Sequence, residues 1–128
     1  MATNYEVNST IVDLTFLNEN FGQDYDAYSQ MIVYFLDQSD EKVLQLKESV
    51  QKSDFINIKS AAHFLKSTFN IMGLKSTQSL IEMEHLSIRE SSIERISELL
   101  NNVVIDLDES LIEYKRILSI ITELKNKH

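Results

Sequence analysis

The sequence predicts an all-α fold, an antiparallel four-helix bundle with a short extra helix at its N-terminal end. The chain contains no proline and only two glycines, whereas the tight turns of a sheet protein usually draw on both residue types. Apolar residues recur at three- and four-residue spacing along most of the chain, which is the period of an amphipathic helix. The length of 128 residues, 43% of them hydrophobic, suits one core, so residues 1–128 are expected to form a single domain.

The N-terminal half is expected to hold three helical segments. Residues 1–10 are polar and are expected to be flexible. Apolar residues within 12–20 predict a short helix that covers one end of the bundle. Residues 24–36 carry apolar side chains at helical spacing. Ser39 then stands where it can cap a further helix, because serine readily accepts hydrogen bonds from the first free backbone N–H groups.

The C-terminal half is expected to hold the remaining helices. A helix over residues 54–72 should end at Gly73, since glycine adopts the left-handed conformation that closes a helix at little cost. Ser76 is expected to begin the next helix, and Ser91 with Glu94 has the spacing of a capping box at the head of the last one. Amphipathic helices of this kind can bury their apolar stripes only against one another, which predicts the bundle.

Composition argues against several classes of function. The formal net charge is −8, and such a surface repels phosphate backbones, so nucleic-acid binding is not expected. No apolar stretch approaches the roughly 20 residues needed to cross a bilayer, and the N-terminus lacks the features of a signal peptide. Cysteine is absent, which excludes disulfides and cysteine-based metal sites. A cytoplasmic protein that binds no membrane is therefore expected.

His63 lies on the polar side of the predicted helix over residues 54–72. At about 100° of rotation per residue, the apolar positions of this helix cluster on one face. They are Ile58, Ala62, Leu65, Phe69 and Met72. The opposite arc, with His63 near its middle, holds Lys59, Ser60, Lys66, Ser67 and Asn70. The imidazole is therefore expected to point into solvent and not into the core.

The neighbours of His63 suit a phosphoryl group. Lys59 and Lys66 share its surface and form a positive spot on an acidic protein, where a group with a charge of roughly −2 can bind. Ser60 and Ser67 are small, so that another protein could approach the ring closely. A neutral imidazole is a competent nucleophile at neutral pH. On these residues alone, an ordinary surface histidine remains the alternative.

The segment Ala62-His63-Phe64-Leu65-Lys66-Ser67, followed by Ile71-Met72-Gly73-Leu74, resembles the signature of the histidine-containing phosphotransfer (HPt) family. That signature runs Ala-His-x-Leu-Lys-Gly, and after several residues a second glycine follows. The layout of residues 12–117 is similar to the family's bundle as well. The resemblance implies that His63 is the phosphoacceptor and that Lys66 steadies the phosphoryl group or the incoming partner. Ser67 stands where the family usually has glycine, which implies slightly altered docking.

The resemblance also implies the function and the partners. A phosphorelay carrier of this family accepts a phosphoryl group from the aspartate of a response-regulator receiver domain and passes it to another receiver aspartate. It neither binds ATP nor autophosphorylates, and this chain has no Gly-rich nucleotide motif. No cofactor is expected on the chain itself, because Mg²⁺ belongs to the receiver. A hybrid sensor histidine kinase is the expected source of phosphate. An uncovered His63 favours a monomer, and Lys59, Ser60, Ser67 and Asn70 are expected to contact the partner.

Two other interpretations remain open at this point. A helical adaptor would keep the bundle and use no phosphotransfer; a buried His63 ring would favour it. Glu82 and His85 have the spacing of a metal-binding pair on one helix face, but di-metal bundles need a second such pair, and none is present. His85 is therefore expected to be a surface or partly buried residue, and His128 a terminal one. The carboxylate pairs Glu82 with Glu84, and Asp106 with Asp108, are expected to lie on solvated helix faces.

Overall fold

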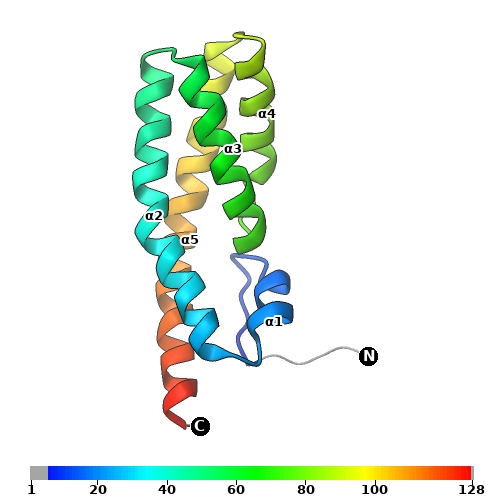
Figure 1. The fold of residues 1–128 in the computed structure, drawn as a ribbon, viewed down its shortest axis with the longest axis vertical. Helices are drawn as coiled ribbons and strands as arrows, with labels where there is room; N and C mark the ends of the chain where they lie inside the picture. Colours follow the sequence, from blue (N-terminus) through cyan, green and yellow to red (C-terminus); the bar gives the residue numbers. More distant parts are fainter. Residues whose placement is uncertain (1–5, 128) are drawn as a thin grey trace.

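The computed structural model describes residues 6–127, which form five α-helices (Figure 1). They are α1 (Thr15–Phe21), α2 (Tyr25–Gln51), α3 (Phe55–Met72), α4 (Thr77–Ile88) and α5 (Ile93–Lys127). Helices α2 to α5 alternate in direction, and α2 and α4 each pack against both α3 and α5. The predicted antiparallel four-helix bundle with a short N-terminal helix is confirmed. None of the helices within residues 6–127 is both long and apolar enough to span a bilayer.

Helix α2 is continuous where the sequence predicted two helices. The predicted cap, Ser39, lies in the middle of α2 and is fully buried. Ser39 is four residues from both Phe35 and Val43, which are buried as well, so it belongs to the same inward stripe. No proline or glycine interrupts residues 25–51, and a buried stripe of this length outweighs the weak helix propensity of one serine.

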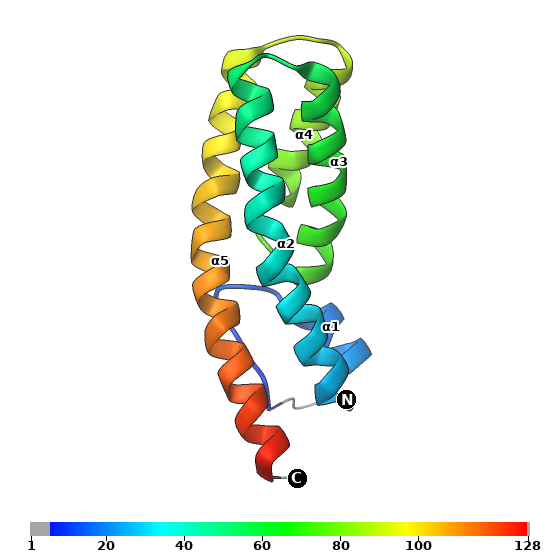
Figure 2. The same ribbon diagram turned by 60° about the vertical axis from the view of Figure 1, so that its left-hand side comes forward.

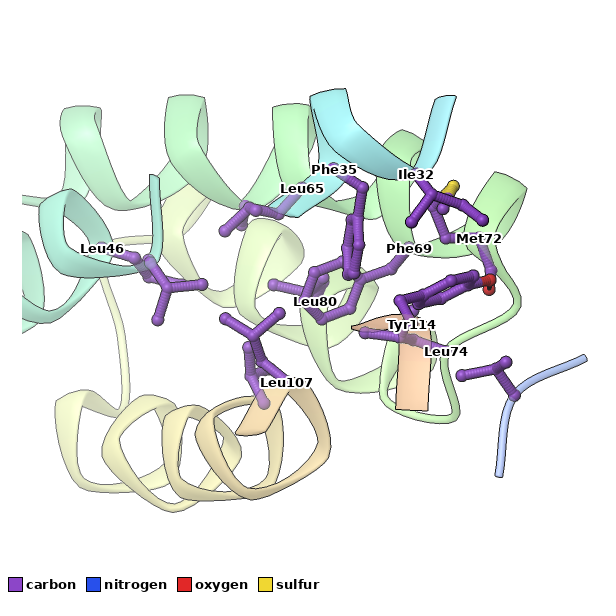
Figure 3. Close-up of a cluster of buried hydrophobic side chains, with 14 of the residues drawn as sticks. Ile32, Phe35, Leu46, Leu65, Phe69, Met72, Leu74, Leu80, Leu107 and Tyr114 are labelled. Carbon is purple, nitrogen blue, oxygen red and sulfur yellow. Dashed lines mark hydrogen bonds between the residues drawn. The ribbon is translucent and has the colours of Figure 1, made fainter. Parts of the chain in front are cut away.

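The core of the bundle fixes the rotation of α3 about its own axis. Leu65 and Phe69 of α3 are fully buried and lie in one cluster with Leu80 of α4 (Figure 3). In the same cluster, the rings of Phe35 and Tyr114 meet edge to face, with centroids 5.2 Å apart, an arrangement that favours aromatic pairs. Since this face of α3 is turned inward, the opposite face is turned outward.

The ends of α3 are closed by specific hydrogen bonds. At its start, the Asp54 side chain accepts a hydrogen bond from the Asn57 N–H at 3.3 Å. At its end, Gly73 has φ 71°, and the Leu74 N–H donates to the Phe69 carbonyl at 2.9 Å. This is the hydrogen bond of a Schellman motif, and it confirms the predicted role of Gly73.

The starts of α4 and α5 differ in how well the sequence predicts them. Ser76 directly precedes α4, as expected. Helix α5 begins at Ile93, and Ser92 before it has φ 57°. The predicted capping box of Ser91 and Glu94 is therefore out of register by one residue.

The segment of residues 6–14 packs along the lower part of the bundle as a strap (Figure 2). Val7 is buried, and its carbonyl accepts a hydrogen bond from Asn18 Nδ2 at 3.1 Å. The Ser9 hydroxyl donates to the Glu113 carboxylate of α5. Within the segment expected to be flexible, residues 6–10 thus make specific contacts with the bundle, while residues 1–5 lie outside the described part.

Candidate functional site

His63 occupies the middle of α3 and points outward. Its side chain is 65% exposed, whereas Ala62 and Leu65 on either side of it are fully buried. The residues predicted to share its surface are also placed there. Lys59, Ser60, Ser67 and Asn70 are exposed, and Lys66 is half-buried. The helical spacing therefore predicted the orientation of this face correctly.

A carboxylate from the neighbouring helix holds His63. Glu84 of α4 accepts contacts from two side chains of α3: its Oε1 lies 2.8 Å from His63 Nδ1, and its Oε2 lies 2.8 Å from Lys66 Nζ. The Glu84 side chain is only 11% exposed, so these two contacts replace most of its hydration. The carboxylate therefore ties the surface histidine and lysine of α3 to α4.

The charge state of Glu84 decides which nitrogen of His63 is reactive. Burial, the largest single effect, raises the pKa of Glu84, but the hydrogen bonds and charges of Lys66 and His63 together lower it below its usual value. Glu84 is thus a carboxylate at neutral pH and can only accept hydrogen bonds. The proton between the two groups must lie on Nδ1, so that a neutral His63 ring carries its lone pair on Nε2.

The sequence suggested that Lys59 and Lys66 form a positive spot, but Lys66 is not free to do so. Its ammonium is neutralised by the Glu84 carboxylate, and of the two lysines it is Lys59 that is exposed. The expectation that Glu84 lies on a solvated face is wrong. Glu84 follows Leu80 by four residues and precedes Ser87 by three, and both of these are buried. A wheel of α4 would have revealed this carboxylate within a buried stripe.

The second carboxylate pair is also split between surface and interior. Asp106 is buried, and its Oδ2 accepts a hydrogen bond from the Ser76 N–H at 2.7 Å, whereas Asp108 is exposed. The solvated-face expectation is therefore wrong for Asp106. The carboxylate thus binds the backbone of the residue that directly precedes α4, the helix that carries Glu84.

The possible metal pair of Glu82 and His85 is not assembled. Glu82 Oε2 lies 2.7 Å from Arg95 Nε, and His85 is exposed. Within residues 6–127 no three or more histidine, aspartate or glutamate side chains gather closely enough to hold a metal ion. His128 lies outside the described residues.

Fold and site together define a class: a helical bundle that presents one carboxylate-bound histidine in the middle of an exposed helix face. Such an arrangement suits a carrier of a covalently attached group. The family model described as Hpt domain matches residues 30–126, which is more than half of the chain. The chain therefore belongs to the Hpt domain family, as its resemblance to the signature implied.

Two solved structures share the fold. Histidine-containing phosphotransfer protein B (HptB) from Pseudomonas aeruginosa PAO1 is 19% identical, with a TM-score of 0.79 over 88% of this chain and 97% of that chain. The HPT domain of a sensor hybrid histidine kinase from Shewanella is 16% identical, with a TM-score of 0.60 over 92% of this chain and 96% of that chain. No curated protein matches the chain significantly. Hpt domains are phosphotransfer carriers rather than ATP-using kinases, and membership of the family supports a histidine-phosphotransfer role in a phosphorelay for this chain.

Proposed function

We propose that His63 accepts a phosphoryl group from the aspartate of a phosphorylated receiver domain and passes it to the aspartate of a second receiver. The observation that carries this proposal is the contact between His63 Nδ1 and the Glu84 carboxylate at 2.8 Å. It leaves Nε2 of an exposed ring with its lone pair available. His85 is exposed too, but no such contact to a carboxylate is present on its ring within residues 6–127.

The transfer step needs no proton to move at the reacting atom. The Nε2 lone pair attacks the phosphorus of the aspartyl phosphate, the P–N bond forms and the P–O bond to the aspartate breaks, so that the carboxylate leaves with the bonding electrons. The hydrogen on Nδ1 stays in place, held by Glu84. The same steps in reverse deliver the group to the next aspartate. Phosphoryl transfer depends mainly on position and charge, and Mg²⁺ on the partner receiver would supply much of the charge.

The remaining site residues have supporting roles in this proposal. Lys66 lies one helical turn from His63 and steadies the phosphoryl group or the receiver. Lys59, Ser60, Ser67 and Asn70 are exposed around the ring and form part of the docking surface for receiver domains. A hybrid sensor histidine kinase would supply the phosphate, and the chain would need neither a bound cofactor nor ATP. A second copy over this face would cover His63, so we expect the active form to be a monomer.

The test is transfer from phosphorylated receiver domains of the same genome to the purified protein. Label should appear on the wild type, resist alkali and be lost in acid, as expected for phosphohistidine. His63→Gln should abolish it, whereas the matched control His85→Gln should leave it unchanged. Failure of every receiver to label a folded wild type would favour the helical adaptor. Label that persists in H63Q would place the phosphoacceptor elsewhere.

A further inference from the structure

Two exposed apolar side chains accompany His63 on α3. Ile56 is 79% exposed, the highest value among the large hydrophobic residues that the structure describes, and Phe64 is 37% exposed. Ile56 precedes His63 by seven residues, which is two helical turns, so it lies on the same face about 10 Å along the axis. Single exposed apolar residues are ordinary on protein surfaces. The arrangement of these two, next to the reactive ring, is what distinguishes them.

Ile56, Ser60 and Phe64 form one ridge on the surface of α3. They follow one another at four-residue spacing, which aligns side chains along a helix. Ser60 in the middle is small and exposed, so the ridge has a notch between two apolar side chains. The Lys42 ammonium of α2 lies 4.9 Å from the centroid of the Phe64 ring, a cation–π contact that holds this side of the notch in place.

The notch continues into a groove between α2 and α3. This groove has a volume of about 380 Å³. Its lining is mostly polar and includes Lys42, Gln45 and Ser60, with Ala61 and Phe64 as its apolar residues. The side of His63 toward α4 carries the ion pair of Lys66 and Glu84. On α4 the exposed large hydrophobic residue is Ile88, at the C-terminal end of the helix.

We propose that a receiver domain docks over the N-terminal half of α3, with one of its apolar side chains in the notch above Ser60, between Ile56 and Phe64. This inference rests on the proposed function. The occupant must be the receiver, because the protein that brings an aspartyl phosphate to His63 necessarily covers the surface around the ring. A specific interface buries about 800 Å² on each partner, a patch that extends beyond Ile56 when it is centred on His63. Apolar anchors in such a patch carry most of the binding energy.

The experiment compares two phosphate donors on the same variants. Phosphoramidate, a small donor, can label His63 without any docking surface, whereas a phosphorylated receiver must dock. Ile56→Asp places a charge in the notch, and Ile112→Asp is the matched control. Ile112 is 72% exposed on α5, which packs against α2 and α4 and, within the described chain, not against α3.

We expect I56D to lower kcat/KM for transfer from the receiver about ten-fold or more, as for the loss of an apolar anchor. Labelling of I56D by phosphoramidate should match the wild type, and I112D should match it with both donors. Receiver transfer that is unchanged in I56D, or equally reduced in I112D, would overturn the docking inference alone. A wild type that accepts phosphate from neither donor would instead overturn the proposed function.

Discussion

The Glu84 carboxylate accepts hydrogen bonds from two side chains of α3, the His63 imidazole and the Lys66 ammonium. The two contacts have different consequences. Lys66 neutralises a carboxylate that has little access to water, and without a partner such a charge would be costly to bury. The contact with His63 places the ring hydrogen on Nδ1 and so selects Nε2 as the nucleophile. Glu84 is thus a positioning residue in the proposed transfer, since it acts through His63.

Glu84→Gln should therefore change the tautomer of His63. An amide offers both a donor and an acceptor, so it no longer requires the hydrogen to be on Nδ1. We expect the Nε2–H form to gain population and the rate of phosphotransfer to fall by roughly ten- to a hundred-fold, the range typical of carboxylates that orient a metal-bound imidazole. Imidazole ¹⁵N chemical shifts report the tautomer directly. A slower E84Q with an unchanged tautomer would show that Glu84 acts in another way.

The same residue predicts a pH dependence of stability. The pKa of Glu84 is lower in the folded protein than its usual value of 4.5. Its ionised form therefore stabilises the fold fully above that usual value, and the contribution is lost as the pH falls through the lower folded pKa. Urea unfolding of wild type and E84Q should show a free-energy difference that is constant near neutral pH and shrinks below about pH 4.5. A difference that does not vary with pH would contradict this linkage.

The sequence predicted only part of the site, because the site comes from two helices. His63, Lys59 and Lys66 lie on α3, whose register follows from its apolar spacing, and the predicted face is the exposed one. The contact with Glu84 joins residues 21 positions apart. The pattern of α4 places Glu84 in a buried stripe, but which residues of α3 it meets depends on how the two helices are placed against each other, which a single helical pattern does not determine.

Among the elements, the end of α3 fits closely against the strap. Gly73 has φ 71°, and its carbonyl accepts a hydrogen bond from the Asp13 N–H at 2.9 Å. A Cβ atom at this position would lie 1.8 Å from the Asp13 carbonyl oxygen. Glycine is therefore required here for two reasons: the backbone is left-handed, and the strap passes too close to leave room for a side chain.

Gly73→Ala should accordingly destabilise the protein by about 2–4 kcal/mol, the sum of left-handed strain and displacement of the strap. Thermal or urea unfolding measures this change. Gly22→Ala is the matched control, because Gly22 has φ −61°, a conformation open to any residue. Its effect should stay within about 1 kcal/mol. Equal losses in the two variants would mean that the close approach of Asp13 to Gly73 matters little.

The continuity of α2 illustrates what local signals can miss at this scale. Ser39 with Asp40 has the composition of a helix start, and the sequence predicted a boundary there. In the structure the helix continues through Ser39, because Ser39 is buried together with Phe35 and Val43 against the rest of the bundle. Capping signals predict where a helix can begin, but tertiary packing determines whether the chain uses them.

For the whole molecule, the long helices α2 and α5 extend past α3 and α4, and the strap and α1 cover this extension (Figures 1 and 2). Tyr28 of α2 donates to Asn18 Oδ1 at 2.9 Å, and Asn18 in turn donates to the Val7 carbonyl. The sequence did not reveal this packing, since Val7 stands alone among polar neighbours and meets its partners only in the folded chain. The family match begins at residue 30, beyond the strap.

Because the strap covers only the extension of α2 and α5, we expect a change in the strap to affect that part of the molecule alone. Val7→Asp should loosen the strap, because a carboxylate cannot stay in the buried position of Val7, and we expect a loss of about 1–3 kcal/mol in the free energy of unfolding. Hydrogen exchange should rise mainly in residues 25–35 and 114–127, where the strap and α1 cover the long helices. Labelling of His63 by phosphoramidate should persist, since His63 lies in the four-helix part, away from the strap. A uniform rise in exchange along α3 and α4 would show instead that the strap supports the entire bundle.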